Sequence, residues 1–534
     1  MAEIKHWADQ LADQIIERSK REGRVANIKC QQTPSGGKHI GNANDVIRAY
    51  FPYKVVLEKG HKAEFVHTSD DRDPMKEVPL RLADLDGNWH DSKKLLDFSK
   101  YMGVPYCNIP DPFKCCESWS KHFTKVWMKG LEMVGMRPKM YYVDDLYKEG
   151  KMRPFVKQVL EKVDIAKEIA AKFQETKRVD TYMPFDAICT NCGRLTSISS
   201  FDLKNWTVKF TCGGKALKKK RAEGCGFEGE TSLDNGKLQW RFEWPALWAL
   251  FHTTYEPFGK DHAEGSYPQG KEVMRRIFEI EPPIPFVYEF FLVSGEKMSA
   301  SKGNVYIIQD MMKVMEPGPF LLFYAKKAQK QRDFDLKNVY TMVDEFDRAE
   351  RFYFGERDKS THFEDNYSRI YELIVDKLPK KMPKRIPYTF AAFISQISED
   401  KRRRELILKD YLKDATAEDI KNGLIRIELA DFWVKHYAPD EYKVKILEHK
   451  PKFGVSPDLK FFFEEVAKEV ERGASGDELQ DFIYSESKRR NLESGKVFRT
   501  AYQLFLGKDK GPRLGPFLAF LDRDFVVNRL KLKG

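Results

Sequence analysis

The chain has 534 residues, of which 42% are hydrophobic and 13% aromatic, enough for several packed units and too many for a chain that is disordered throughout. Its formal charge of +11, from 92 basic and 81 acidic residues, fits a polyanionic partner and a well-solvated surface equally well. No apolar stretch approaches the ~20 residues that a membrane-spanning helix needs, which excludes a helical membrane protein.

The N-terminal segment predicts an amphipathic helix rather than a secretory signal. Its apolar residues Trp7, Leu11, Ile15 and Ile16 recur at helical spacing, and acidic residues run through its length. Without a signal, the eight cysteines favour reduced thiols or metal ligands over a disulfide framework. We therefore expect a cytoplasmic protein.

The following segments have the order of a parallel α/β sheet. Residues 24–30 predict a short strand, "TPSGGKH" follows at 33–39, and apolar residues spaced by three and four predict a helix over 40–50. Residues 63–74, "AEFVHTSDDRDP", predict a second strand that ends in a cluster of acids. Because ligands of such sheets bind beyond the carboxyl ends of the strands, we expect both the glycine-rich turn and the acids at a ligand site.

The glycine-rich turn is a candidate anion site. The start of a helix offers unpaired N–H groups and a partial positive charge, and Gly36, Gly37 and Gly41 would let a ligand approach the backbone. His39 could donate to a phosphate oxygen, and Lys38 adds charge. By itself, the stretch fits an ordinary strand-to-helix turn at least as well.

A second candidate phosphate element is the loop "SGEKMSASKGN" at 294–304. A flexible glycine and serine loop that carries Lys297 and Lys302 could close over a triphosphate and neutralise charge as the α-phosphate is attacked. A basic surface loop is the alternative interpretation.

Taken together, "HIGN" and "KMSASKGN" in this order, about 260 residues apart and bracketing an α/β region, resemble the "HIGH" and "KMSKS" signatures of class I aminoacyl-tRNA synthetases. Asn42 and the "SASKGN" continuation resemble the class I lysyl-tRNA synthetases, as do "SDDRDPMKEVP", "IPDPFKCCESWSKHF" and "WRFEWPALWALF". The clear motifs of this resemblance cover roughly residues 15–355.

The resemblance implies a Rossmann-like α/β catalytic domain followed by an all-α, helix-cage region that binds the anticodon. We place the two halves of the catalytic domain at 1–185 and 233–318, a Cys-rich zinc-binding insertion at 186–232, and the helical region at 319–534.

The resemblance also implies an ATP site and a lysine pocket. The ATP site would consist of Gly36, His39, Gly41, Asn42, Lys297, Ser299, Ser301 and Lys302, with His39, Lys297 and Lys302 acting in catalysis. The lysine pocket would include Thr33, Trp240, His262 and Tyr288, with Asp261 beside it, touching ribose or the α-amino group.

Two residues depart from the family pattern. Gln31 stands in the lysine pocket where a small Gly is expected, so the pocket is expected to be narrowed or differently hydrogen-bonded. Ala300 occupies the position of the middle lysine of "KMSKS", which leaves more of that role to Lys302.

A lysine-selective pocket needs a partner for the ε-ammonium group, because burying that charge unpaired would cost several kcal/mol. Asp70 and Asp71 are candidates, although they could equally cap the following turn. Trp240 could add cation–π attraction, or it could belong with Trp244 and Trp248 to the buried face of a helix.

The cysteines of the insertion predict a metal site. Cys189 and Cys192 have a C-x-x-C spacing, and Cys212 and Cys225 follow with adjacent glycines, as in a structural four-cysteine zinc site. Four reduced thiols are the alternative, since twelve residues separate the second pair. For the other cysteines, Cys30, Cys107, Cys115 and Cys116, we expect buried or partly buried thiols.

The sequence therefore predicts an enzyme that attaches L-lysine to tRNA(Lys) through lysyl-adenylate, using Mg²⁺ with ATP, as a monomer without a membrane partner. A glutamyl-type class I synthetase and a non-catalytic RNA-binding or regulatory protein derived from a synthetase remain alternatives.

Overall fold

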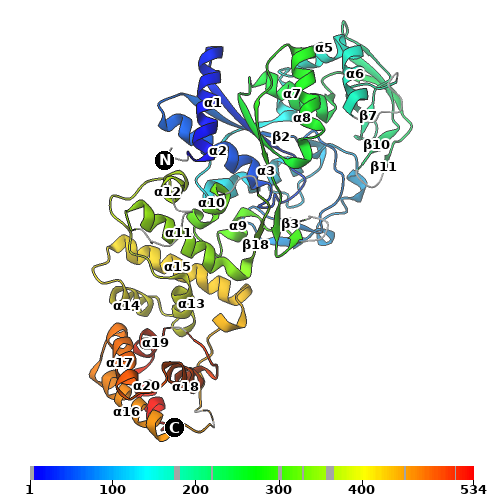
Figure 1. Ribbon diagram of the computed structural model, residues 1–534. Helices are drawn as coiled ribbons and strands as arrows, with labels where there is room; N and C mark the ends of the chain where they lie inside the picture. The colour runs from blue at the N-terminus through cyan, green and yellow to red at the C-terminus, as the bar shows by residue number, and fades with distance from the viewer. Residues whose placement is uncertain are drawn as a thin grey trace. The chain divides into compact units, whose positions relative to one another are not determined.

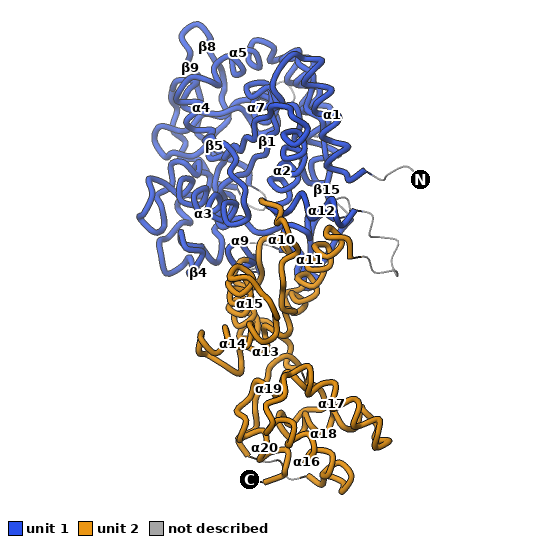
Figure 2. The backbone as a smooth tube through the Cα atoms, turned by 90° about the vertical axis from the view of Figure 1, so that its left-hand side faces the viewer, with its two compact units in different colours: residues 1–311, 321–334, 360–376 blue, residues 312–320, 335–359, 377–534 orange. Residues whose placement is uncertain are grey.

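The computed structural model describes residues 5–173, 181–217, 221–298, 304–326, 330–356, 366–449, 451, 453–511 and 513–533. The chain forms two compact units, which Figure 2 distinguishes by colour. The first consists of residues 1–311, 321–334 and 360–376, and the second of residues 312–320, 335–359 and 377–534.

A five-stranded parallel sheet forms the centre of the first unit, in the order β15-β14-β1-β2-β5. Its strands are β1 (Ala26–Gln32), β2 (Ala63–Ser69), β5 (Lys139–Tyr142), β14 (Tyr255–Gly259) and β15 (Ile284–Tyr288). The chain proceeds from β1 to β2 on one side, whereas β14 pairs with β1 on the other, so the strand order reverses between β1 and β14. Such a switch point is where an open α/β sheet binds its ligand.

Helices cover both faces of this sheet (Figure 1). Neighbouring residues of a strand point to opposite faces. The hydroxyl of Tyr255 donates to the carbonyl of Arg48 in α2 (Ala43–Glu58), while Glu256 accepts from the indoles of α7 (Trp240–Leu250). Thus α2 lies on one face of β14 and α7 on the other, and the predicted Rossmann-like fold is confirmed.

Shorter elements complete the first unit. Its other helices are α1 (Trp7–Glu22), α3 (Trp119–Met133), α4 (Val143–Lys148), α5 (Arg153–Glu161), α6 (Val163–Phe173), α8 (Ser266–Val273), α9 (Ile308–Met311) and α12 (Tyr367–Ile374). The remaining strands outside the insertion are β3 (Arg81–Ala83), β4 (Trp89–Asp91), β16 (Phe291–Val293), β17 (Glu296–Lys297) and β18 (Arg332–Phe334). The helix α10 (Pro317–Ala325) spans the boundary at 320.

The Cys-rich segment folds into small antiparallel sheets. They are built from β6 (Phe185–Ile188), β7 (Leu195–Ser197), β8 (Ser200–Asp202), β9 (Thr207–Thr211), β10 (Gly214–Ala216), β11 (Arg221–Glu223), β12 (Glu228–Ser232) and β13 (Gly236–Leu238). Side chains of these strands and of α5–α7 share one hydrophobic core, which includes Phe185, Phe210 and Trp244. The domain boundaries predicted at 185 and 232 stay predictions.

The second unit is helical, as the sequence predicts for the region after 318. Its helices are α11 (Val339–Tyr353), α13 (Tyr388–Ile397), α14 (Lys401–Tyr411), α15 (Ala417–His436), α16 (Pro457–Arg472), α17 (Gly476–Arg489), α18 (Ser494–Leu506), α19 (Leu514–Phe520) and α20 (Arg523–Leu530). The buried Arg426 guanidinium in α15 donates to Asp347 in α11 and to Glu316, at 2.7 Å each. These charge-assisted bonds tie separate helices of the unit together.

Candidate functional site

A cavity of about 350 Å³ opens at the carboxyl ends of β1, β2 and β14. It is lined by polar and aromatic side chains together with one proline: Gln31, Gln32, Thr33, Lys38, Asn42, Asp45, Asp70, Asp73, Lys76, Trp240, Trp244, Glu256, Pro257, Phe258 and His262. Four of these residues are acidic and three are aromatic. This composition suits a ligand that carries positive charge on an apolar chain.

A buried ion pair forms part of the cavity wall. The Nζ atom of Lys29 lies 3.2 Å from Oε1 of Glu256, and the indoles of Trp244 and Trp248 donate to the two oxygens of the same carboxylate at 3.1 and 2.6 Å. Burial raises the pKa of Glu256, and Lys29 opposes this shift. The amide oxygen of Gln31 accepts from Lys29 at 2.6 Å. Gln31 therefore lies in the cavity and takes part in a hydrogen bond that glycine could not make.

A second buried ion pair holds Asp73. Lys237 donates to Oδ1 of Asp73 at 2.6 Å and contacts Glu243 at 2.6 Å, while the hydroxyl of Thr33 donates to Oδ2 of Asp73 at 3.1 Å. Burial alone would raise the pKa of Asp73, but the charges of Lys237 and Lys76 outweigh it and lower that pKa. Asp73 and Glu256 thus each have a lysine of the protein as partner.

The other two carboxylates of the cavity, Asp70 and Asp45, have no lysine partner in contact among the described residues. Oδ1 of Asp70 is buried and has no hydrogen-bond partner within the described residues, and burial raises the pKa of Asp70 well above its usual range. Asp45, in the first turn of α2, accepts a hydrogen bond of 2.5 Å from the hydroxyl of Tyr288. Burial raises the pKa of Asp45 to about 7, although this hydrogen bond opposes the shift.

The glycine-rich turn packs closely around His39. A Cβ atom on Gly41 would lie 2.9 Å from the imidazole ring and 3.1 Å from the methyl group of Met298, so glycine is needed there for close packing. A Cβ on Gly36, whose φ is +128°, would lie 3.0 Å from Pro79. Burial and the charge of Lys38 lower the pKa of His39 to about 4. The imidazole is therefore neutral at pH 7, and its buried Nδ1 has no hydrogen-bond partner in the described part of the chain.

Residues 5–377 match a family model described as "tRNA synthetases class I (K)". The chain belongs to this family. Curated relatives named "Lysine--tRNA ligase" include those of Natronomonas pharaonis, 38% identical over 99% of this chain and 97% of that protein, and Pyrococcus horikoshii, 35% identical over 99% of this chain and 100% of that protein. A solved glutamate tRNA ligase from Elizabethkingia meningosepticum is 12% identical and covers 95% of this chain and 99% of its own, with a TM-score of 0.40.

The cavity of this class I synthetase contains part of the predicted lysine pocket. Gln31, Thr33, Asp70, Trp240 and His262 line it, and the Trp240 ring lies 5.2 Å from the rings of both Trp244 and His262. Of the ATP-site residues, Asn42 also lines it, and its carbonyl accepts from Gln32 at 2.8 Å.

Three predicted pocket residues do not line the cavity. Oδ1 of Asp71 accepts the backbone N–H of Asp144, in the first turn of α4, at 2.8 Å, so its partner lies in a distant helix and not in the turn that follows β2. Tyr288 is buried and reaches the cavity through Asp45, and Asp261 is exposed in the turn that follows β14. Sequence reasoning did not select Asp45, Lys29 and Glu256. The signal available for the last two was a charged residue inside a strand with apolar neighbours on both sides, in "IKC" and in "YEP".

The predicted closing loop is described over residues 294–298 and at Asn304. Lys297 is exposed at the end of β17, and its Nζ lies 3.9 Å from the centre of the Phe290 ring. Ser299, Ala300, Ser301 and Lys302 lie outside the described residues. The search for membrane-spanning helices, limited to the described residues of this synthetase, found none of sufficient length and apolar character.

The four cysteines of the insertion converge, with all four sulfur atoms within 4.8 Å of one another. The Sγ atoms of Cys189 and Cys225 are 3.7 Å apart, and those of Cys192 and Cys212 are 3.6 Å apart. A disulfide would require about 2.05 Å. A tetrahedral zinc with Zn–S bonds of about 2.3 Å sets the sulfur atoms about 3.8 Å apart. The residues therefore fit a closed, four-thiolate metal site.

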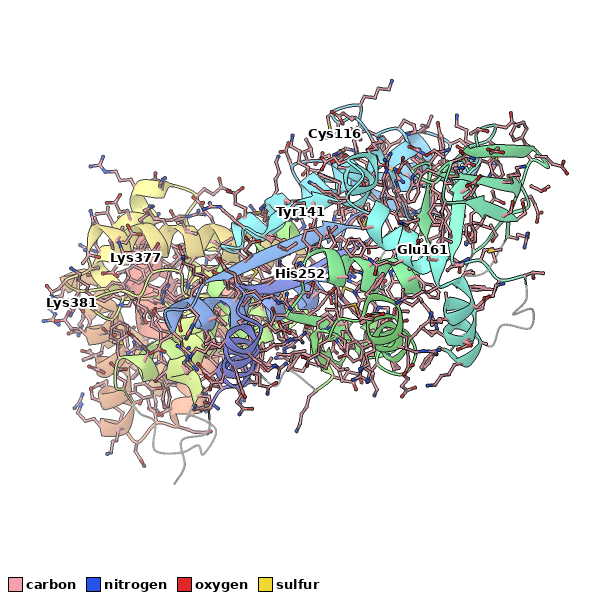
Figure 3. The ribbon with its side chains drawn as sticks, turned by 90° about the horizontal axis from the view of Figure 1, so that it is seen from above. Cys116, Tyr141, Glu161, His252, Lys377 and Lys381 are labelled. Atoms are coloured by element: carbon pink, nitrogen blue, oxygen red, sulfur yellow. The ribbon has the colours of Figure 1, made fainter. Side chains whose placement is uncertain are left out.

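A second cluster was not anticipated as a metal site. One ligand atom from each of Asp111, Cys115, Cys116 and His122 lies within 4.8 Å of the others, and Figure 3 labels Cys116 in the loop before α3. Nε2 of His122 lies 3.0 Å from the carbonyl oxygen of Ala83, so it can donate there while Nδ1 faces the cluster. Holding the distal nitrogen in this way is typical of histidines that ligate metals. The sequence signal was the adjacent "CC" flanked by Asp and His.

Proposed function

We propose that this protein attaches L-lysine to tRNA(Lys) by way of a lysyl-adenylate. The observation that carries the proposal is the match, over 99% of the chain, to relatives named "Lysine--tRNA ligase". The cavity supports it, since it combines four acidic residues with three aromatic ones. A glutamate substrate would place another carboxylate against these acids, so the charge of the cavity disfavours a glutamyl-type enzyme.

In the first step, the carboxylate of lysine attacks the α-phosphorus of ATP and pyrophosphate leaves. ATP brings Mg²⁺, which supplies positive charge for its phosphates. Gly36, His39, Gly41 and Asn42 bind ATP at the start of α2, where backbone N–H groups face an anion. The neutral imidazole of His39 donates a hydrogen bond to a phosphate oxygen as negative charge develops there.

The loop after β17 supplies the remaining contacts to ATP. Lys297, Ser299, Ser301 and Lys302 close over the phosphates, and the two lysines neutralise the charge of the leaving pyrophosphate. The 2′-hydroxyl of the terminal adenosine of tRNA(Lys) then attacks the lysyl carbonyl carbon and loses its proton, and AMP leaves as the mixed anhydride breaks. The protein acts mainly by holding the reacting groups in position.

The amino acid lies in the cavity described above. Trp240 and His262 form an aromatic wall along the methylene chain, Thr33 and Gln31 contribute polar contacts, and Asp70 receives an ammonium group. Asp261 lies at the edge of this pocket, and Tyr288 acts through Asp45. Asp71 has a structural role beside Asp144.

Each of the two clusters of metal-binding side chains would hold a structural zinc ion. Cys189, Cys192, Cys212 and Cys225 would supply four thiolate ligands, and the second cluster would supply one carboxylate, one imidazole and two thiolates. Neither set leaves an open position for a substrate, so zinc stabilises the insertion and the loop before α3. We further propose that the helical region from 319 binds the anticodon of tRNA(Lys), and that the protein works in the cytoplasm as a monomer.

ATP–pyrophosphate exchange, measured with lysine, with glutamate and with no amino acid, tests the proposed function. tRNA must be present in every reaction, since some enzymes of this architecture activate the amino acid only with tRNA bound. We expect exchange with lysine alone. Exchange with glutamate alone would replace the lysyl assignment, and no exchange with either amino acid would favour a regulatory RNA-binding protein.

A further inference from the structure

The charges that line the amino-acid cavity do not balance within the protein. Asp73 is paired with Lys237 at 2.6 Å, and Glu256 with Lys29 at 3.2 Å. Among the described residues, neither Asp45 nor Asp70 forms an ion pair, and Oδ1 of Asp70 has no hydrogen-bond partner. Two of the four acids of the cavity are therefore left without a cation in contact.

The lysines that line the cavity do not remove this imbalance. Nζ of Lys76 lies 3.8 Å from Asp73, which already has a partner, and Nζ of Lys38 lies 3.5 Å from the hydroxyl of Ser35. Burial lowers the pKa of Lys38 to about 8, while Asp70 and Asp45 act on it electrostatically in the opposite direction. Lys38 thus adds positive potential without forming an ion pair with either carboxylate.

The two unmatched carboxylates approach the cavity from different sides. Asp70 directly follows β2, whereas Asp45 is held on α2 and is fixed by Tyr288 at the end of β15. In the sheet, β1 and β14 lie between β2 and β15. A ligand seated over the ends of β1 and β14 can therefore meet one carboxylate at each side.

We propose that Asp45 and Asp70 receive the two ammonium groups of the amino acid substrate, one each, and that Asp45 thereby helps to select a dibasic amino acid. The inference rests on the proposed function. Lysine carries an α-ammonium and an ε-ammonium, which matches the number of carboxylates that lack a cation. A buried carboxylate is costly to ionise alone and gains most when a ligand supplies its counter-ion.

Two analogues that each lack one ammonium group can test this pairing. Norleucine lacks the ε-ammonium, and 6-aminohexanoate lacks the α-ammonium. Their inhibition constants would be measured against lysyl-tRNA formation, with ATP and tRNA present, for the wild type, Asp45→Asn and Asp70→Asn. Residual activity of the variants at saturating lysine provides the assay, and thermal unfolding checks that each variant is folded.

We expect a complementary pattern. One variant should bind one analogue about 100-fold more weakly and should bind the other analogue with nearly unchanged affinity. The second variant should show the reverse, because each analogue lacks the ammonium group that one of the two carboxylates contacts. Tyr288→Phe, which leaves the carboxylate of Asp45 in place, should raise the inhibition constant of the same analogue as Asp45→Asn does, but by a smaller factor. Glu17→Gln, an exposed change in α1, should leave the inhibition constants of both analogues unchanged.

If both variants bound both analogues equally more weakly, the effect would be a general electrostatic one, and the pairing of each carboxylate with one ammonium group would be overturned. Unchanged inhibition in Asp45→Asn would remove Asp45 from the site. A wild-type protein that forms no lysyl-tRNA would instead contradict the proposed function, so the two failures are distinguishable.

Discussion

Lys29 and Glu256 form an ion pair between neighbouring parallel strands, with Nζ 3.2 Å from Oε1 and side-chain exposures of 0% and 2%. Two indoles and the amide of Gln31 complete the hydrogen bonding around this pair. A buried ion pair is tolerated only when its remaining polar atoms are satisfied, and this one meets that condition beside the amino-acid cavity.

Removing one member of this pair should destabilise the protein strongly. Glu256→Leu leaves the ammonium of Lys29 buried without its partner, so we expect the free energy of unfolding to fall by about 3–5 kcal/mol. Urea unfolding followed by circular dichroism would measure it. The double variant Lys29→Met/Glu256→Leu buries no charge and should lose less than the single variant. A double variant as unstable as the single one would mean that packing, and not charge, dominates.

Replacing His39 should impair adenylation selectively. His39→Ala removes a half-buried neutral donor beside the start of α2, and loss of one such donor typically lowers the rate by about 10²–10³-fold. Pyrophosphate exchange gives the rate, and a filter-binding assay gives the affinity for tRNA, which should change little. His252→Asn, an exposed change after α7, serves as the matched control. Equal losses of exchange and of tRNA binding would identify His39 as a structural residue.

The affinity for lysine should rise with pH around neutrality. The pKa of Asp45 is raised to about 7 by burial and by the charges of Glu256 and Asp261, against the effects of Tyr288 and Lys38. A cationic ligand binds the ionised carboxylate, so kcat/KM for lysine should increase as pH rises through about 7 and then level off. In Asp45→Asn this step should disappear, and a step that persists would have to be assigned to another group.

The raised pKa of Asp45 makes the stability of the ligand-free protein fall as pH rises, whereas the affinity for lysine increases. The folded form holds the proton of Asp45 more tightly than the unfolded chain, whose carboxyl titrates near the ordinary value of 3.8. This contribution to the free energy of unfolding is therefore fully present below that value and is lost as pH rises to about 7. Comparing the pH dependence of Tm in wild type and Asp45→Asn would isolate it, and identical profiles would contradict it.

The metal content should reflect two independent sites. Elemental analysis of the purified protein should find about two zinc ions per chain, since the two clusters each provide four ligands suited to zinc. Cys189→Ala and Cys116→Ala should each remove about one ion, whereas Cys107→Ala, outside both clusters, should remove none. Chelation should lower Tm, because zinc binding stabilises only the folded sites. A content that stays at two in Cys116→Ala would exclude the second site.

The glycine-rich turn and the loop from 294 are identified by their residue types together with their order and separation along the chain. Short motifs can be read from sequence because residue types and spacing restrict the backbone path. Apolar spacing likewise predicts the N-terminal helix and the helix over 40–50. The C-x-x-C spacing likewise predicts that Cys189 and Cys192 lie together.

The pairing of charges in the cavity depended on the tertiary structure. Lys29 and Glu256 are 227 positions apart, and Tyr288 and Asp45 are 243 apart, so no local pattern could show which acids have partners. The tertiary structure also distinguishes Asp70 from Asp71. The first lines the cavity, whereas the second accepts the N–H of Asp144. The sequence by itself determined the family, the α/β class of the catalytic region and the motifs that bracket it. Only the fold decided which carboxylates are neutralised and which are left for a ligand, because electrostatic partners are set by distance in space and not by distance along the chain.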